Sequence, residues 1–397
     1  MQSMMNAVAL CAGGVEKVVA NELRKLEFPV LDARFGRVRF CADLAGLYRA
    51  LMSLRAADRV LLEVGRFAAP DFDALFEGTS AIEWEAFIPK AMGLRVAKVR
   101  VNHSRLQAET TVQAMTHKAA AVRLCAAYKQ SRLPDTIKHA ELRVYIEKDE
   151  ASLLLDLSGE ALFKRGYRRE GGVAPLRETT AAALLLLAGW RRKFPLYDPF
   201  CGSGTLAIEA VIYAWDMAPG LGRGFALSDL GIADPEIERM VREELAAKVD
   251  FSRTMRIFGS DADAELVRIA RVNAQRAYSL ALGKEVVGDP VPLPWLPDFH
   301  ALAMKAVHAP TSDVGFIITN PPYGKRLGVR ADSERTYQEM EVLSRNFPGW
   351  RLGVISDHAG FESFFGRKAD SCRELTNGAL RSYFFVYDHL GWPYGRA

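Results

Sequence analysis

An Asn-Pro-Pro-Tyr tetrad, Asn320 to Tyr323, directly follows a short apolar run, Phe316 to Thr319, that suits a buried strand. The amide oxygen of Asn320 and the main-chain carbonyl of Pro321 could each accept one N–H bond from an exocyclic amine on adenine, on guanine or on a Gln side chain. Such an amine is a poor nucleophile because its lone pair is delocalised. Two fixed acceptors would pull the nitrogen toward tetrahedral geometry and aim the lone pair at an electrophilic methyl group.

The other residues of the tetrad fit the same chemistry. Proline lacks an N–H and has a fixed φ, so Pro321 and Pro322 make the loop stiff. Tyr323 offers a flat face on which a planar base could lie after leaving its stack. The alternative is that the tetrad is only a turn at a strand end, since Asn-Pro and Pro-Pro are common turn signals.

A second motif, Leu196 to Ala210, reads LYDPFCGSGTLAIEA and lies about a hundred residues before the tetrad. An acidic residue ends a short apolar run, and a glycine-rich loop and a helical pattern follow it. In the order strand, tight turn, helix, Gly202 and Gly204 would allow close approach of a ligand to free N–H groups at a helix start. A nicotinamide dinucleotide is the rival ligand, but the third glycine of its fingerprint is replaced by Ala207.

Further acidic residues follow predicted strands of a doubly wound sheet. Arg256 to Ser260 reads as a strand that ends in Asp261, where this fold class holds a ribose diol. Val286 to Asp289 is expected to be a third strand, with Asp289 facing an adenine edge. Each acid alone is also typical of a helix cap or a turn. Leu352 to Ser356 and Ala379 to Asp388 are expected to be late strands, the second in a hairpin.

The segments DPFCGSGT, GSDAD and NPPYGKRL together resemble the class I S-adenosylmethionine-dependent methyltransferases of the THUMP-containing RNA family, which makes N2-methylguanosine in ribosomal or transfer RNA. The resemblance covers nearly the whole chain. Residues 103–124 and 153–169 are similar to the body and the exit of the THUMP domain, and residues 174–185 are similar to the segment that leads into the methyltransferase.

The resemblance implies a class I methyltransferase fold, a Rossmann-like doubly wound α/β sheet with a late antiparallel hairpin, preceded by α+β ferredoxin-like and THUMP modules. It implies Asn320, Pro321, Pro322 and Tyr323 as the catalytic tetrad. The cofactor, S-adenosylmethionine, would be contacted by residues of the glycine loop, the strand ends and the segment before them: Glu178, Thr179, Asp198, Pro199, Gly202, Gly204, Asp261 and Asp289. Many relatives have an acidic residue after N-P-P-Y-G, where this chain has Lys325.

Composition agrees with a large enzyme of two or three domains, because 397 residues with 49% hydrophobic content can furnish more than one core. No apolar stretch reaches the roughly 20 residues that cross a bilayer, and we expect a cytoplasmic protein without membrane contact. The five cysteines form no C-x-x-C pair and are expected to be free thiols. Cys201 could be read as a nucleophile, but transfer from a sulfonium needs no covalent enzyme intermediate. The seven histidines lack metal-ligand spacing, so no metal is expected.

Charge is distributed unevenly along the chain. Residues 1–170 carry 26 Lys and Arg against 21 Asp and Glu, and Lys90 to Arg143 alone holds 11 basic and three acidic residues. Such a surface attracts a phosphate backbone, mainly without sequence discrimination, although a solvated basic face is the alternative. With the THUMP resemblance we expect an RNA-binding surface that includes five basic residues: Lys98, Arg100, Arg105, Lys118 and Arg123.

The predicted organisation has three parts. Residues 1–60 are expected to form a ferredoxin-like module in which two strands bracket an amphipathic helix. Residues 61–165 are expected to form the THUMP domain, with strands at Leu94 to Val101 and Ser152 to Leu157 around a helix at Thr111 to Tyr128. Residues 166–397 would be the methyltransferase. Three residues mark a hinge between the last two parts, Gly171, Gly172 and Pro175.

The sequence therefore predicts a monomeric enzyme that methylates the N2 amine of a guanosine in 23S ribosomal RNA. A transfer RNA guanine-N2 methyltransferase and an adenine-N6 methyltransferase remain alternatives, because the tetrad recognises an amine more readily than a ring. A catalytically silent RNA-binding factor of ribosome assembly is the alternative outside the enzymes. The intact tetrad, glycine loop and ribose acid argue against silence.

Overall fold

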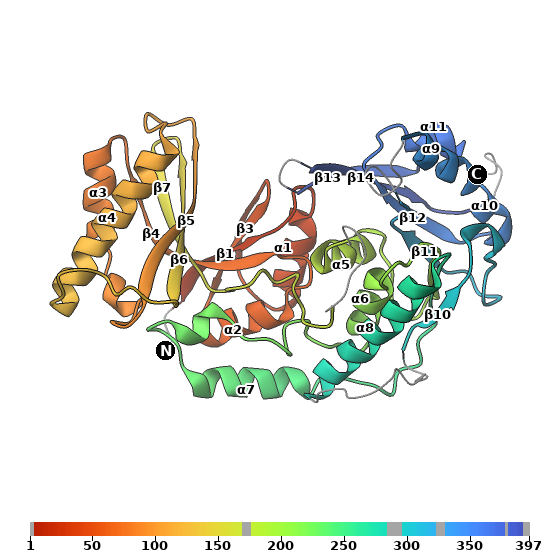
Figure 1. The fold of residues 1–397 in the computed structure, drawn as a ribbon, viewed down its shortest axis with the longest axis horizontal. Coiled ribbons are helices and arrows are strands. Elements are labelled where there is room, and N and C mark those ends of the chain that lie inside the picture. Colours follow the sequence, from red (N-terminus) through yellow and green to blue (C-terminus); the bar gives the residue numbers. More distant parts are fainter. Residues whose placement is uncertain (1–3, 169–175, 284–295, 323–329, 378–379, 392–397) are drawn as a thin grey trace.

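Two seven-stranded sheets follow one another along the long axis of the molecule (Figure 1). They are seen in a computed structural model, which describes residues 4–168, 176–283, 296–322, 330–377 and 380–391. The first sheet belongs to the N-terminal part of the chain and the second to the C-terminal part. The predicted hinge residues 171, 172 and 175 lie outside the described residues.

The first sheet is mostly antiparallel, with one parallel pair at its β5 edge. Its strands in spatial order are β2 (Val30–Arg34), β3 (Arg37–Ala42), β1 (Met5–Leu10), β4 (Arg59–Ala68), β7 (Glu150–Asp156), β6 (His139–Glu147) and β5 (Gly93–Asn102). The helices of this part are α1 (Glu16–Lys25), α2 (Leu44–Ser53), α3 (Phe72–Ser80), α4 (Glu109–Tyr128) and the 3-10 turn η1 (Trp84–Ala86).

The helices cover one face of this sheet, and the side-chain alternation of the strands shows which face it is. Ala7 and Ala9 of β1 belong to the main core, whereas Val8 between them packs with Leu61 and Leu154 in a separate small cluster. Since α1 to α4 contact the strands on the core side, the small cluster lies on the opposite face. That face is therefore free to carry charged side chains.

The predicted strands at 94–101 and 152–157 and the helix at 111–128 are confirmed within one or two residues at most ends. Local patterns did not indicate β2 or β6. The predicted boundary between residues 60 and 61 falls inside β4, which pairs with β1 on one side and with β7 on the other. The N-terminal parts thus share one continuous sheet, and their division stays a prediction.

In the second sheet one strand, the last but one in spatial order, runs antiparallel to both of its neighbours, and the other strands are parallel. Its strands in spatial order are β10 (Asp298–Ala301), β9 (Ile257–Asp261), β8 (Leu196–Asp198), β11 (Phe316–Thr319), β12 (Arg351–Ser356), β14 (Leu380–Tyr387) and β13 (Ser371–Asn377). The helices are α5 (Glu178–Leu187), α6 (Thr205–Ala214), α7 (Pro235–Ala246), α8 (Ala264–Leu282), α9 (Arg330–Glu339), α10 (Val342–Asn346) and α11 (Phe361–Phe365), with 3-10 turns η2 (Ala226–Asp229) and η3 (Met304–Ala306).

Both faces of the second sheet are covered, as parallel sheets require. Ile318 of β11 belongs to the core shared with α5, α6 and α8, while its neighbour Ile317 packs in a second core with Tyr337 of α9 and Phe361 of α11. All residues of β8 and β11 are buried. This is the doubly wound arrangement with a late antiparallel hairpin that the sequence predicts.

The predicted strands before Asp261 and at 352–356 are confirmed, and the hairpin strand at 379–388 is confirmed for β14. The expected strand at 286–289 lies outside the described residues. In the described part of the sheet, β10 is the strand that pairs with β9 on its outer side.

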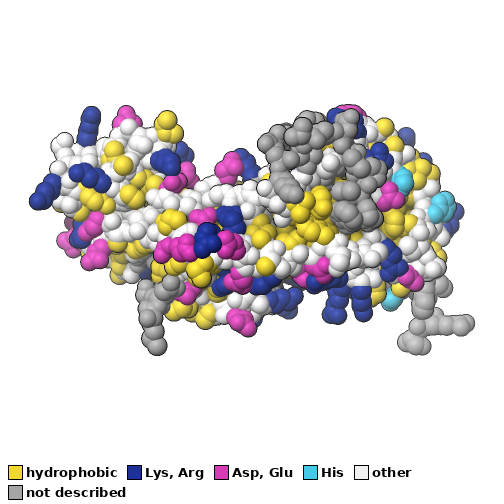
Figure 2. All heavy atoms as spheres, turned by 90° about the horizontal axis from the view of Figure 1, so that it is seen from below, with side chains coloured by type: hydrophobic (Ala, Val, Ile, Leu, Met, Phe, Trp, Pro, Cys, Tyr) yellow, Lys and Arg dark blue, Asp and Glu magenta, His cyan; other side chains and the backbone are white. Residues whose placement is uncertain are grey.

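Two sets of contacts join the N-terminal part of the chain to the C-terminal part. Gly13 and Thr376 exchange two main-chain hydrogen bonds of 2.9 and 3.0 Å, which tie the N-terminal part to β13. On another side, α7 packs against α2, with an ion pair of 2.6 Å between Arg49 and Glu244. Seen from below, acidic and basic side chains mix over the middle of this face (Figure 2). The charged helix α7 thus braces the N-terminal part.

None of the helices within the described ranges is long and apolar enough to span a bilayer.

Candidate active site

Three polar residues meet at the carboxyl ends of adjacent strands. Asp198 ends β8, Asp261 ends β9, and Asn320 directly follows β11. Since β8 lies between β9 and β11, the strand order reverses at β8. In doubly wound sheets the crevice at this reversal is the usual ligand site.

Asp198 is buried and tied to the neighbouring strand. Its Oδ1 accepts a hydrogen bond of 2.6 Å from the Thr319 hydroxyl and one of 3.2 Å from the main-chain N–H of Phe200. Burial raises the pKa of Asp198 to about 7, although the hydrogen bond from Thr319 lowers it. A ligand that donates hydrogen bonds or brings positive charge would therefore favour the ionised carboxylate.

Asp261 holds the glycine-rich loop in place. Its Oδ2 accepts a hydrogen bond of 2.9 Å from the N–H of Gly202, and its Oδ1 accepts one of 3.0 Å from the N–H of Asp263. The loop is also fixed by a bond of 2.9 Å from the N–H of Cys201 to the carbonyl of Ser260. Each carboxylate oxygen of Asp261 retains a lone pair that a ribose hydroxyl could use.

Gly202 and Gly204 both adopt left-handed backbone angles, with φ of 51° and 85°. A Cβ on Gly202 would meet no atom within 4 Å, whereas one on Gly204 would lie 3.0 Å from side-chain atoms of Ala270 and Phe299. Gly202 thus leaves room beside the strand ends, and Gly204 lets α6 pack against α8. The two glycines are required for different reasons.

A cavity of about 570 Å³ lies over these strand ends. Its volume is in the range of small-molecule sites. Among the described residues it is lined by Leu176, Asp198, Pro199, Phe200, Cys201, Gly202, Ser203, Thr205, Leu206, Asp261, Ala262, Asp263, Leu266, Met304, Asn320 and Pro322. The N-terminus of α6 and three carboxylates, set among apolar side chains, fit a nucleoside that carries a positively charged group.

Asn320 is 8% exposed, and its Oδ1 has no hydrogen-bond partner among the residues that the structure describes. Buried acceptors are nearly always satisfied, and a donor on a ligand in the cavity would satisfy this oxygen. Pro321 is buried beside it, and Pro322 lines the cavity. Tyr323 and Lys325 lie outside the described residues.

Two predicted cofactor contacts lie away from the described cavity wall. Glu178 is buried and pairs with Arg168 at 3.2 Å. Thr179 donates a hydrogen bond of 2.6 Å to Asp58 of the N-terminal part. Pro199 does line the cavity, and Asp289 lies outside the described residues. Contact of Glu178 and Thr179 with a cofactor stays a prediction.

Cys201 lines the cavity, but burial raises the pKa of its thiol well above the ordinary value. A buried neutral thiol is a poor nucleophile. This agrees with the expectation that the reaction needs no covalent enzyme intermediate. Across the described residues, no three His, Cys, Asp or Glu side chains are grouped so that they could hold a metal ion.

A second cavity, of about 680 Å³, is strongly basic; we call it the basic pocket. It lies on the face of the first sheet opposite the helices. Seven of its lining residues are basic and two are acidic; they are Arg34, Arg37, Arg59, Lys98, Arg100, Arg143 and Arg177, with Asp58 and Glu147. Burial lowers the pKa of Lys98, and the charges of Arg100 and Arg143 lower it further. The pocket is therefore suited to anions.

Of the five basic residues predicted to bind RNA, Lys98 and Arg100 line the basic pocket and three do not. Arg105 lies 3.6 Å from Asp149. Lys118 and Arg123 belong to α4, which covers the opposite face of the sheet, and the Arg123 guanidinium pairs with Glu85. The structure thus divides the predicted basic surface between two faces.

Several lining residues carry no signal in the sequence motifs. Leu176 and Met304 reach the active-site cavity from a segment before α5 and from η3. Arg34, Arg59 and Arg177 reach the basic pocket from outside the basic run at 90–143. Thr205 and Asp263 are the last residues of the segments DPFCGSGT and GSDAD, so these motifs could have indicated them as lining residues.

Two family profiles match the chain. One describes an RMKL-like methyltransferase domain and matches residues 165–383; the other describes an RlmL ferredoxin-like domain and matches residues 6–61. A curated relative from Bacillus subtilis, named "Putative RNA methyltransferase YpsC", is 36% identical over 96% of this chain and 95% of its own length. Another, from Syntrophotalea carbinolica, is named "Ribosomal RNA large subunit methyltransferase K/L". It is 33% identical over 98% of this chain, which spans only 54% of that relative's length.

Solved structures agree with these matches. A "possible methylase" from Clostridium difficile 630 is 34% identical, with a TM-score of 0.88 over 99% of this chain and all of its own. SMU.472, described as a "putative methyltransferase complexed with SAH", is 32% identical, with a TM-score of 0.85 over the full length of both chains. TrmN from Thermus thermophilus is 22% identical, with a TM-score of 0.68 over 98% of this chain and all of its own, and shares the fold.

The contrast between the two glycines gives a matched pair of variants. Gly202→Ala should cost about 1 kcal/mol of unfolding free energy, because the left-handed angle is strained but the space is open. Gly204→Ala adds a collision with Ala270 and Phe299 and should cost about 2 to 4 kcal/mol in all. Urea denaturation measures both. Equal losses would show that the close approach of α6 to α8 does not depend on Gly204.

Proposed function

The chain belongs to the RMKL-like methyltransferase family, and on that premise we propose that it transfers a methyl group from S-adenosylmethionine to the N2 amine of a guanosine in RNA. Its enzyme class and cofactor follow from the family and from the relative solved with S-adenosylhomocysteine. The observation that supports the choice of an amine is the buried oxygen of Asn320 in the wall of the active-site cavity, which has no hydrogen-bond partner within the described ranges.

The described residues have separable tasks in this proposal. Asp261, fixed by two main-chain N–H groups, would accept hydrogen bonds from the ribose hydroxyls. Asp198 would face the positively charged part of the cofactor, whose charge compensates the cost of ionising a buried carboxylate. The cofactor supplies an electrophilic methyl group when bound. The open space at Gly202 would admit the cofactor without a change in the backbone conformation of the loop.

Asn320 and Pro321 would act on the amine that receives the methyl group. The Asn320 Oδ1 accepts one N–H bond and the Pro321 carbonyl accepts the other, which holds the nitrogen lone pair toward the cofactor. Both bonds strengthen as the nitrogen becomes cationic, so they favour the transition state over the ground state. We propose that Tyr323 stacks on the base. No residue need be a strong base, since the proton leaves after the methyl group has been transferred.

RNA would dock on the basic pocket of the first sheet. Lys98, Arg100 and five further Arg side chains line this pocket. Arginine is suited to phosphate groups because its guanidinium presents a planar fork of hydrogen-bond donors. Leu176 lines the active-site cavity while the next residue, Arg177, lines the basic pocket. One bound strand could therefore reach both. We propose residues 61–165 as the THUMP domain and residues 1–60 as the ferredoxin-like module of this docking surface.

Ribosomal RNA of the large subunit is the substrate we favour, because the relative from Syntrophotalea carbinolica carries that activity in its name and matches nearly all of this chain. The enzyme would act as a monomer in the cytoplasm. A guanosine in transfer RNA and the N6 amine of adenine are alternatives, since Asn320 and Pro321 accept hydrogen bonds from either amine. Contacts with the ring of the target base must therefore distinguish guanine from adenine.

Asn320→Ala tests the catalytic role of the tetrad. Loss of one preorganised acceptor should lower the rate of methyl transfer about 10² to 10³-fold, the order found for removal of a single oxyanion-hole contact. Affinity for S-adenosylhomocysteine should change less than about threefold, a span of under 1 kcal/mol. Single-turnover transfer to substrate RNA and calorimetry measure the two effects. A wild-type rate in the variant would show that the tetrad is only a turn.

A matched pair of lysine variants tests the docking surface. Lys98→Gln removes a charge from the basic pocket, whereas Lys118→Gln removes one from α4 on the opposite face. The first should weaken RNA binding and reduce the slope of log affinity against log salt by about 1, and the second should do neither. Filter binding over a salt series gives both quantities. The same slope change in both variants would contradict docking at the basic pocket.

A further inference from the structure

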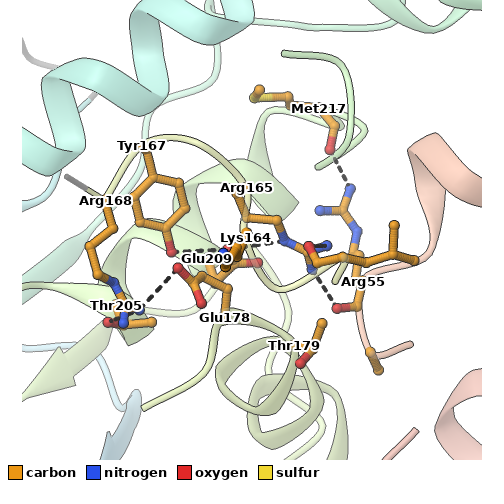
Figure 3. A network of polar contacts seen from close by, with 12 residues as sticks. Arg55, Lys164, Arg165, Tyr167, Arg168, Glu178, Thr179, Thr205, Glu209 and Met217 are labelled. Carbon is orange, nitrogen blue, oxygen red and sulfur yellow. Dashed lines mark hydrogen bonds and ion pairs between the residues drawn. The ribbon is translucent and has the colours of Figure 1, made fainter. Parts of the chain in front are cut away.

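A cluster of buried charged side chains lies between the N-terminal part and the second sheet (Figure 3). Arg165 is 3% exposed and lies 3.7 Å from Glu209 of α6, and Tyr167 donates a hydrogen bond of 3.1 Å to the same carboxylate. Arg168 pairs with Glu178 at the start of α5. Buried ion pairs are poor evidence of stability by themselves, because desolvation offsets their attraction. The position of these ion pairs says more about their role than their contribution to stability does.

Arg168 contacts two separate walls of the active-site cavity. Its Nη2 donates a hydrogen bond of 2.9 Å to the carbonyl of Leu176 and one of 3.0 Å to the hydroxyl of Thr205. Leu176 and Thr205 both line the cavity, whereas Arg168 is absent from its described lining. Thr205 opens α6 directly after the glycine loop, and Leu176 precedes α5. One guanidinium group therefore fixes the distance between the loop side and the α5 side of the cavity.

We propose that Arg168 is a positioning residue for S-adenosylmethionine, which holds Leu176 and Thr205 at the separation that the cofactor requires. The proposal rests on the family's cofactor and not on the RNA substrate. It concerns a side chain that acts behind the cavity wall. The Glu178 carboxylate lies 3.2 Å from the same nitrogen of Arg168 and compensates its charge, whereas the hydrogen bonds to Leu176 and Thr205 hold the two walls.

The N-terminal part anchors this arrangement. Arg165, three residues before Arg168, donates a hydrogen bond of 2.5 Å to the carbonyl of Arg55. Arg55 in turn donates one of 2.8 Å to the carbonyl of Met217, beyond α6. On the other side of Arg168, Thr179 bonds to Asp58. The segments before and after residues 169–175 are thus both held by residues 55–58, and the cofactor cavity depends on a support outside the second sheet.

Two effects of removing Arg168 must be separated. The pKa of Glu178 is raised to about 7 by burial and lowered by Arg168, so loss of the guanidinium leaves a buried carboxyl with less compensation. That loss alone would destabilise the fold. A positioning role predicts in addition a loss of cofactor affinity that is independent of the charge on Glu178.

A double-variant cycle distinguishes these effects. Arg168→Met is compared with wild type, and Arg168→Met/Glu178→Gln with Glu178→Gln, by calorimetry with S-adenosylhomocysteine and by thermal unfolding of the full chain. We expect Arg168→Met to weaken binding about tenfold, the order of one or two lost hydrogen bonds, in both backgrounds. The loss of unfolding temperature should be smaller in the Glu178→Gln background.

Unchanged affinity in Arg168→Met would overturn the proposal. So would an affinity loss that Glu178→Gln abolishes, because Arg168 would then act only by compensating a charge. If Arg168→Met does not fold, Arg168→Lys is measured in the same way. It keeps the positive charge, but its side chain is one bond shorter and places the ammonium short of the Nη2 position that bonds Leu176 and Thr205, so we expect a several-fold weaker affinity. Wild-type affinity would contradict positioning. No RNA enters these measurements, so failure here leaves the proposed RNA substrate untouched.

Discussion

Desolvation of acceptor groups at the carboxyl edge of the second sheet is the constraint on which the rest of the structure depends. Asp198 and the amide oxygen of Asn320 are buried at neighbouring strand ends, and the Asn320 oxygen has no hydrogen-bond partner among the described residues. The raised pKa of Asp198 and the unsatisfied oxygen are two consequences of the same burial. A cationic cofactor and an amine substrate would each supply what one of these groups lacks. The site is therefore preorganised for ligands that donate hydrogen bonds.

The same constraint explains why the N-terminal part is more than an attached RNA-binding module. A cavity lined by a buried carboxylate needs rigid walls, and part of that rigidity comes from the chain of contacts through Arg55, Arg165 and Arg168. Adjacent residues Leu176 and Arg177 then line the two cavities. If RNA docks at the basic pocket as proposed, RNA and cofactor would share one short segment before α5.

The features that could be predicted from the sequence are those encoded by neighbouring residues. The strand, loop and helix around Gly202 and Gly204, the acid at Asp261 and the tetrad at Asn320 each occupy a few consecutive positions, and the fold class followed from their order. The basic pocket could not be predicted in this way, because antiparallel pairing brings Arg34, Arg59 and Arg143 together from distant strands. A count of charges along residues 90–143 cannot show that Lys98 and Lys118 face opposite sides. Arg168 lies in a basic run that resembles a solvated segment, and only tertiary contacts reveal it as buried support.

We propose that this protein methylates the N2 amine of a guanosine in RNA. The most direct test is mass spectrometric mapping of ribosomal and transfer RNA from cells that have or lack the gene, followed by treatment of the deficient RNA with purified protein and S-adenosylmethionine. We expect one N2-methylguanosine in large-subunit ribosomal RNA to disappear with the gene and to be restored by the protein. Restoration of N6-methyladenosine, or of no modified nucleoside at all, would contradict it.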